Sequence, residues 1–176
     1  MNCVTINGES TTIKDIINVA RNGYQVKISE DAVKKIQRAR DFVDKLVEAD
    51  KAVYGITTGF GEFSKVSISK EQAGELQRNL IISHSCGVGD HFSEEVVRAI
   101  MVLRVNALSK GFSGIRLETI NGLVEMLNKG VHPAIPEKGS LGASGDLAPL
   151  SHMVLPLIGE GGGAVEPVKG GHGVVS

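Results

Sequence analysis

The sequence predicts a mainly α-helical protein that has a few short strands near its N-terminus. Several long segments place apolar residues at the three- and four-residue intervals of a helix, and most of these segments are flanked by capping residues. β-Branched residues cluster in two short runs near the start of the chain. With 176 residues, of which 41% are hydrophobic, the chain is large enough to bury one core.

The N-terminal part is expected to alternate between strands and helices. The β-branched runs predict strands over residues 4–6 and 26–28. Two helices follow hydroxyl residues whose oxygen can accept from a first-turn N–H: residues 13–20 after Thr11 or Thr12, and residues 30–50 after Ser29. Residues 53–61 contain three glycines and predict a strand end that runs into a loop.

Three further helices are predicted in the middle of the chain. Ser69 and Gln72 have the spacing of a capping box, and the helix behind them reaches residues 83–86. The other two helices cover residues 94–110 and 117–129, and each ends in a lysine followed by glycine, which favours a C-terminus at that point.

Proline and glycine mark the last part of the chain. They predict a loop over residues 132–145, and residues 146–149 then resemble a helix start. Residues 159–176 are rich in glycine and lack periodicity. We therefore expect residues 1–158 to form the folded portion and residues 159–176 to form a flexible tail.

Charge and cysteine content exclude several classes of protein. A formal net charge of -1 argues against nucleic acid or an anionic membrane surface as the partner. No apolar run approaches the length of a membrane span, and the first residues lack the pattern of a secretory signal. Cys3 and Cys86 provide no disulfide framework, so we expect a cytoplasmic location. His84, Cys86 and His91 do not have the spacing of a zinc site, so no metal is expected.

Residues 139–146, Gly-Ser-Leu-Gly-Ala-Ser-Gly-Asp, form the segment most informative about chemistry. They lack the Gly-Lys-Ser/Thr of a P-loop and the strand–glycine–helix unit of a dinucleotide site. From spacing alone, a glycine-rich turn before a helix is the leading interpretation, followed by an anion site at the helix N-terminus.

A third interpretation of this segment is cyclisation of the backbone. The amide nitrogen of Gly145 would attack the carbonyl of Ala143, because glycine has no side chain to obstruct a compressed backbone. Ser144 between them can lose water and become an exocyclic methylene. Asp146 can assist the proton transfers. The product would be an electrophile that no standard side chain provides.

Four blocks in order along the chain resemble the aromatic amino acid ammonia-lyases, and they are most similar to the members that use histidine. The blocks are residues 54–61; 78–84; 104–108 with 111–114; and 132–136 with 139–150. The resemblance covers residues 4–159. It implies the N-terminal part of the L-aspartase/fumarase-like helical fold.

The resemblance also implies a reaction and its residues. Ala143, Ser144 and Gly145 match the residues that form the methylidene-imidazolone prosthetic group, MIO, in this family, and no external cofactor is implied. Tyr54 matches the catalytic base. Ser83 and His84 match the position that selects the substrate ring. The implied reaction converts L-histidine to trans-urocanate and ammonia, a step of histidine catabolism.

The family is much longer than this chain, and its active sites combine several subunits of a tetramer. The resemblance therefore implies a homo-oligomer, or a partner chain that supplies the missing helices. Two alternatives stay open from the sequence. The first is an inactive helical fragment that associates with a partner chain. The second is another MIO enzyme, either a phenylalanine or tyrosine ammonia-lyase or an aminomutase.

Overall fold

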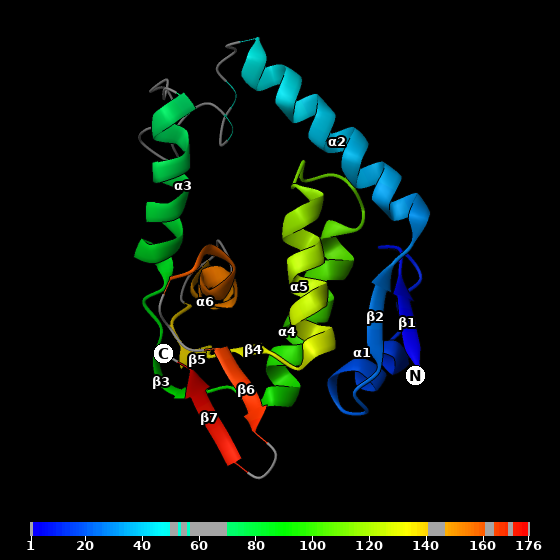
Figure 1. The fold of residues 1–176 in the computed structure, drawn as a ribbon, viewed down its shortest axis with the longest axis vertical. Coiled ribbons are helices and arrows are strands. Elements are labelled where there is room, and N and C mark those ends of the chain that lie inside the picture. Colours follow the sequence, from blue (N-terminus) through cyan, green and yellow to red (C-terminus); the bar gives the residue numbers. More distant parts are fainter. Residues whose placement is uncertain are drawn as a thin grey trace.

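The computed structural model describes residues 2–49, 53, 56, 70–140, 147–160, 164–168 and 171–175. It confirms a mainly helical fold with short strands (Figure 1). The helices are α1 (Ile13–Ala20), α2 (Glu30–Glu48), α3 (Lys70–His84), α4 (Glu94–Leu108), α5 (Leu117–Lys129), α6 (Leu147–Val154) and the 3-10 helix η2 (Leu155–Ile158). The strands are β1 (Cys3–Ile6), β2 (Gln25–Ile28), β3 (Val88–His91), β4 (His132–Pro133), β5 (Pro136–Lys138), β6 (Ala164–Val168) and β7 (Gly171–Val175).

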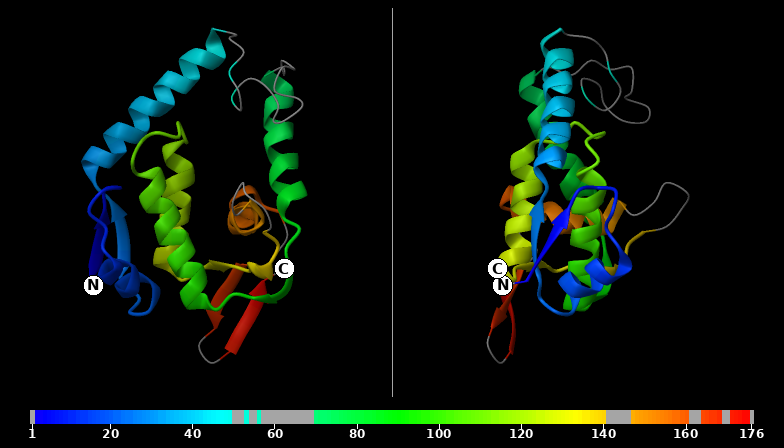
Figure 2. Two further views of the ribbon diagram at one scale, coloured as in Figure 1. Left: turned by 180° about the vertical axis from the view of Figure 1, so that it is seen from behind. Right: turned by 90° about the vertical axis from the view of Figure 1, so that its right-hand side faces the viewer.

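Helices α4 and α5 pack against each other at the centre of the molecule. Strands β1 and β2 lie on one side of this pair together with α1, and α6 and α3 lie on the other side (Figures 1 and 2). Buried apolar side chains from both sides meet in one core: Val4, Ile6, Val19, Val26, Ile36, Val97, Met101, Val102, Val105, Leu108, Ile120, Leu123, Met126, Leu127, Ile135 and Met153. The large helical core and the small sheet therefore fold as one unit.

Local sequence signals explain where the helices begin and end. The Thr12 hydroxyl accepts from the Asp15 N–H at 3.2 Å, and the Asp15 carboxylate accepts from the Thr12 N–H at 2.9 Å, which completes a capping box. Ser29 accepts from the Ala32 N–H at the start of α2. Gly130 ends α5 with φ +72°, a left-handed conformation that favours glycine. These predicted helix boundaries are confirmed.

Strands β1 and β2 form a parallel pair whose outer edge is closed by a side chain. The Asn128 amide on α5 donates to the Val26 carbonyl at 2.9 Å, and its oxygen accepts from the Val26 N–H at 2.8 Å. A neighbouring strand would satisfy the same two backbone groups. Asn128 therefore anchors the sheet to the helical core.

A buried arginine ties three further elements together. Arg98 on α4 is 5% exposed, and its guanidinium donates to the carbonyls of Val19 and Leu127 at 3.0 and 3.1 Å. It also donates to Nε2 of the buried His132 at 2.9 Å. Since His132 Nε2 accepts this bond, the ring is neutral and its other nitrogen carries the proton. The contacts of His132 therefore give it a structural role.

The buried His132 makes stability depend on pH. Burial lowers the pKa of His132; the Glu94 carboxylate opposes this effect and the Arg98 guanidinium adds to it. His132 binds a proton at the ordinary pKa of about 6.5 in the unfolded chain and only at a lower pH in the folded chain. The contribution of His132 to the free energy of unfolding is therefore fully present above the ordinary pKa. It falls as the pH drops below that value, by at most about 1.4 kcal/mol per pH unit.

Urea unfolding between pH 7.5 and 5.0 measures this slope. His132→Gln keeps an acceptor for Arg98 without a titrating ring, so we expect a shallower slope below pH 6.5. Ser93→Ala, at an exposed position before α4 whose side chain makes no capping hydrogen bond, is the control and leaves the slope unchanged. His152, whose pKa burial and His91 also lower, accounts for part of the slope that remains. An identical slope in His132→Gln and the unsubstituted chain contradicts the prediction.

The predicted loop over residues 132–145 is wrong in part, because it contains β4 and β5. Strand β5 pairs antiparallel with β3, with Val88 opposite Lys138 and His91 opposite Pro136. The Phe92 N–H also donates to the Ile135 carbonyl at 2.9 Å. These strands are short, contain proline or glycine and depend on partners far away in the sequence, so no local pattern indicates them.

Residues 159–176, whose glycine content predicts a flexible tail, contain two strands that the sequence did not indicate. Strands β6 and β7 form an antiparallel pair, and β6 pairs with β4 through His132 opposite Val165 (Figure 1). The physical reason is the valine content of both segments, since β-branched residues favour strands. Strands are therefore not confined to the N-terminal part of the chain.

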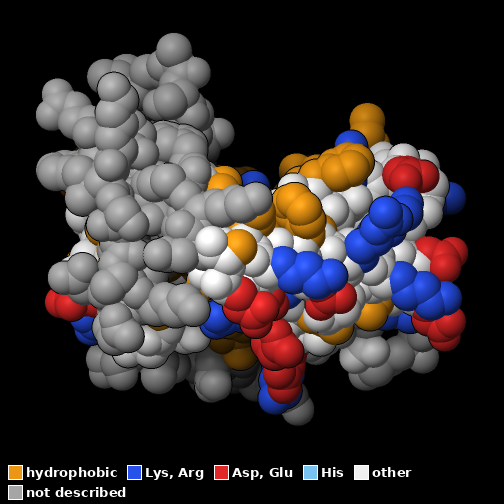
Figure 3. Space-filling view, turned by 90° about the horizontal axis from the view of Figure 1, so that it is seen from above, with side chains coloured by type: hydrophobic (Ala, Val, Ile, Leu, Met, Phe, Trp, Pro, Cys, Tyr) orange, Lys and Arg blue, Asp and Glu red, His pale blue; other side chains and the backbone are white. Residues whose placement is uncertain are grey.

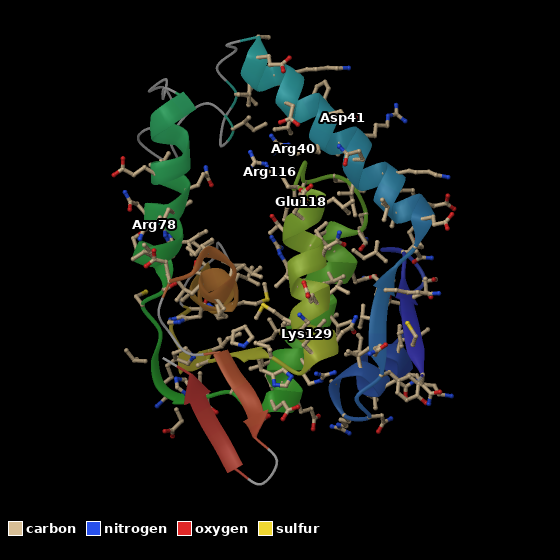
Figure 4. All side chains as sticks on the ribbon, in the orientation of Figure 1. Arg40, Asp41, Arg78, Arg116, Glu118 and Lys129 are labelled. Carbon is tan, nitrogen blue, oxygen red and sulfur yellow. The ribbon has the colours of Figure 1, made fainter. Side chains whose placement is uncertain are left out.

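Helix α2 crosses the upper end of the α4–α5 pair and is held there by a charged contact. Arg40 of α2 donates to the Gly114 carbonyl at 3.2 Å and forms an ion pair with Asp44. Figure 4 shows Arg40 close to Arg116 and Glu118, between α2 and the start of α5. Within the described ranges, no helix is both long and apolar enough to cross a membrane.

Candidate functional site

Ser83 and His84 lie in the last turn of α3, where the predicted substrate-selecting pair is expected. The Ser83 hydroxyl donates to the Leu80 carbonyl at 3.0 Å and lies 3.2 Å from His84 Nδ1. Nδ1 of His84 is 2.8 Å from the same carbonyl. A carbonyl can only accept, so Nδ1 carries the proton. In the tautomer with the proton on Nδ1, Nε2 is the acceptor, which suits a ligand with an N–H group.

The turn after α3 passes very close to the start of the segment that carries the predicted cyclisation. A Cβ on Gly139 would lie 2.8 Å from the Gly87 Cα and 3.1 Å from the Ala148 Cβ. A Cβ on Gly87 would lie 3.0 Å from a Pro136 side-chain carbon. The first of these distances is shorter than real Cβ contacts, and the 3.0 Å contact requires its neighbour to shift by a few tenths of an ångström, so the two backbones pack directly on each other. Residues 141–146 thus follow a stem that is fixed against the end of α3.

Helix α6 fixes the other side of the same segment. It begins at Leu147 and packs along α3 (Figure 1). His152 of α6 accepts the Gly87 N–H on Nε2 at 3.0 Å. Arg78, labelled on α3 in Figure 4, forms an ion pair with Glu160 beyond η2. The entry stem, α6 and the end of α3 therefore converge at Gly87.

The remaining predicted site residues lie outside the described part of the chain. They are Tyr54, Ala143, Ser144, Gly145 and Asp146. The structure therefore positions Ser83, His84 and the two flanks of residues 141–146, while the roles of all these residues stay predictions. In the part that the structure describes, no three His, Cys, Asp or Glu side chains gather as a metal site requires.

Comparison with known proteins decides the family. The family model for aromatic amino acid lyases matches residues 11–172. The chain belongs to the aromatic amino acid lyase family. Histidine ammonia-lyase from Alkaliphilus oremlandii is 66% identical to this lyase chain over 161 residues, which are 92% of the chain and 32% of that protein. The chain thus spans about a third of the length of the curated relatives it matches.

Solved structures of lyases and aminomutases have the same fold as this lyase chain. Histidine ammonia-lyase from Trypanosoma cruzi superimposes with a TM-score of 0.82 at 43% identity, covering 92% of this chain and 31% of that chain. Tyrosine aminomutase from Streptomyces globisporus superimposes with a TM-score of 0.86 at 38% identity, covering 97% and 31%. The N-terminal fold is thus shared by proteins named for different reactions, so the fold alone does not select the substrate.

A large groove of this lyase chain lies away from the candidate site. It has a volume of about 880 Å³ and lies between α2 and the joint of α4 and α5. Its apolar lining includes Phe42, Val43 and Phe112, and its rim carries Lys35 and Lys110. Figure 3 shows hydrophobic side chains gathered between charged ones on this upper face. Neither Ser83 nor His84 lines the groove, so it is not the predicted substrate site.

The sequence singled out Gly139 as the start of residues 139–146, but it indicated neither Gly87 nor His152 of this candidate site. Gly87, Gly139 and His152 form the junction between α3, β5 and α6, but His152 lies 65 positions after Gly87. No periodicity or motif links residues at such a separation. The one signal in the sequence was Gly139-Ser140 before the predicted cyclising residues. It indicated a turn but not that the turn packs on Gly87.

Proposed function

We propose that this chain is the N-terminal portion of a histidine ammonia-lyase that converts L-histidine to trans-urocanate and ammonia. The observation that carries the proposal is the 66% identity to a histidine ammonia-lyase over 92% of the chain. The Ser83–His84 pair supports histidine as the substrate, because the tautomer of His84 with its proton on Nδ1 offers an acceptor on Nε2 to the N–H of a substrate imidazole.

The flanks of residues 141–146 suit formation of MIO from Ala143, Ser144 and Gly145. Cyclisation needs a compressed backbone, and the contact between Gly139 and Gly87 leaves no space for a Cβ. The group, once formed, supplies an electrophile that makes the substrate ammonium a better leaving group. Asp146 follows the three residues directly and is proposed to assist the proton transfers that form the ring.

Proton removal is assigned to Tyr54. The substrate loses a β-proton and its C–N bond breaks, so a base must take the proton while ammonia departs. A free tyrosine has a pKa of about 10, and the phenolate of Tyr54 therefore has to be stabilised in the assembled site. Because the chain spans a third of its relatives, we propose that other helices complete this site in a homotetramer or from a partner chain.

A fusion protein tests the proposed function. In it, this chain replaces the matching third of the Alkaliphilus oremlandii relative, which is similar enough over that third to accept the exchange. We expect L-histidine to yield urocanate, detected by its absorbance, and the intact mass to be lower by two waters. Phenylalanine and tyrosine are the substrate controls. A fusion protein that keeps its full mass, or that prefers either control substrate, overturns the proposal.

His84→Leu in the fusion protein tests substrate recognition. Removing the acceptor leaves the substrate N–H unpaired, so we expect KM for L-histidine to rise about 10- to 100-fold. The loss of two waters is expected to stay. His91→Leu, on the exposed strand β3, is the matched control. An unchanged KM in His84→Leu shows that this ring does not bind the substrate.

A further inference from the structure

His152 stands at the point where both parts of the proposed site are held. It belongs to α6, which starts at Leu147 directly after residues 141–146. Its Nε2 accepts the N–H of Gly87, three residues after His84. One side chain therefore connects the helix that leaves the cyclising segment to the turn that follows the substrate-selecting pair.

The protonation state of His152 suits this connection. Nε2 accepts a hydrogen bond, so it holds a lone pair and the neutral ring carries its proton on Nδ1. Burial lowers the pKa of His152, and the nearby His91 lowers it further. The ring is thus neutral at pH 7 and remains able to accept the Gly87 N–H.

Because Gly87 is closely packed, its position determines how the end of α3 lies relative to Gly139. Gly87 contacts the stem residue Gly139 backbone to backbone, and a Cβ on Gly87 would lie 3.0 Å from His152 Nε2. A displacement of Gly87 cannot be absorbed by a side chain at this junction, because neither glycine has one. It would move the end of α3 relative to the stem of residues 141–146.

We propose that His152 is a positioning residue for the deamination: its bond to Gly87 holds Ser83 and His84 in register with Gly139 and Leu147, the described flanks of the segment that carries Ala143, Ser144 and Gly145. This inference rests on the proposed function. It assigns His152 no contact with the substrate. It also explains why an acceptor, rather than an apolar side chain, faces the backbone at this place in α6.

Two substitutions separate the hydrogen bond from the bulk of the ring. In His152→Gln, the acceptor Oε1 is separated from Cα by the same number of covalent bonds as Nε2 is in histidine. His152→Leu removes the acceptor. A misplacement of about 1 Å can cost about 100-fold in rate, so we expect kcat of the His152→Leu fusion protein to fall about 100-fold while KM changes little. His152→Gln is expected to restore kcat to within about threefold of the unsubstituted protein. Ser93→Ala, at an exposed position whose side chain makes no capping hydrogen bond, is the control.

Amide hydrogen exchange in the 176-residue chain provides a second readout that does not depend on activity. We expect His152→Leu to increase exchange at Gly87 selectively, with exchange at Gly87 unchanged in His152→Gln and Ser93→Ala. Equal protection of Gly87 in His152→Leu, a uniform rise along α3, β3 and α4, or failure of His152→Gln to restore kcat overturns the inference. A fusion protein without urocanate formation, but with Gly87 exchange that depends on residue 152, overturns the proposed function and the catalytic role while the structural bond stands.

Discussion

Replacing Ser144 by alanine is expected to abolish urocanate formation in the fusion protein, with turnover reduced by at least about 1000-fold. Alanine has no hydroxyl to lose, so the exocyclic methylene cannot form even if the backbone closes. The intact mass distinguishes the two steps, because the unsubstituted protein loses two waters and Ser144→Ala loses one at most. Mass spectrometry and urocanate absorbance on the same sample measure both effects.

Ser93→Ala is the matched control for this substitution. Ser93 is exposed at the start of α4, and its side chain makes no capping hydrogen bond. Its removal should leave the mass loss and the turnover unchanged. Full turnover of Ser144→Ala would refute the assignment of MIO to residues 143–145, whatever the mass.

Replacing Gly139 by alanine is expected to cause the second-largest loss, about 100-fold in turnover, with a smaller fraction of chains that have lost two waters. The new Cβ would lie 2.8 Å from the Gly87 Cα, which is a backbone atom and cannot rotate away. The stem of residues 141–146 must then separate from the end of α3. Intact mass gives the cyclised fraction, and turnover per cyclised chain gives the effect on the site.

Gly74→Ala provides the comparison for this second substitution. Gly74 lies within α3, and a Cβ added there meets no atom within 4 Å. Alanine favours a helix over glycine, so we expect Gly74→Ala to raise the free energy of unfolding by at most about 1 kcal/mol and to leave turnover unchanged. Equal turnover in Gly139→Ala and Gly74→Ala would show that the packing at Gly87 is irrelevant to the reaction.

The helices could be predicted because their signals are local. Thr12, Ser29 and Gly130 each cap a helix through groups within a few residues of themselves, and all three positions are visible in the sequence. Strands β3 to β7 could not be predicted in this way. Each depends on a partner strand, and His132–Pro133 has neither alternation nor a free N–H at the proline to indicate pairing.

In the candidate site too, the residues with local signals could be predicted and those with only non-local contacts could not. Ala143, Ser144 and Gly145 are contiguous, so their chemistry can be read from three neighbouring residue types. The support around them is non-local, since His152 reaches Gly87 across 65 positions and the Gly139 backbone packs on Gly87. Sequence reasoning therefore identified the residues proposed to react and missed those proposed to hold them in place.

The bond between Asn128 and Val26 has a consequence for synthesis of the chain on the ribosome. The two residues are separated by 102 positions, so the edge of β2 stays open until that length of chain has been translated. At about 5 to 20 residues per second, this interval lasts roughly 5 to 20 seconds. During it, the nascent strands expose pairing groups that other emerging polypeptides can bind. The first two strands are therefore a part of this polypeptide that a chaperone can protect until α5 leaves the exit tunnel.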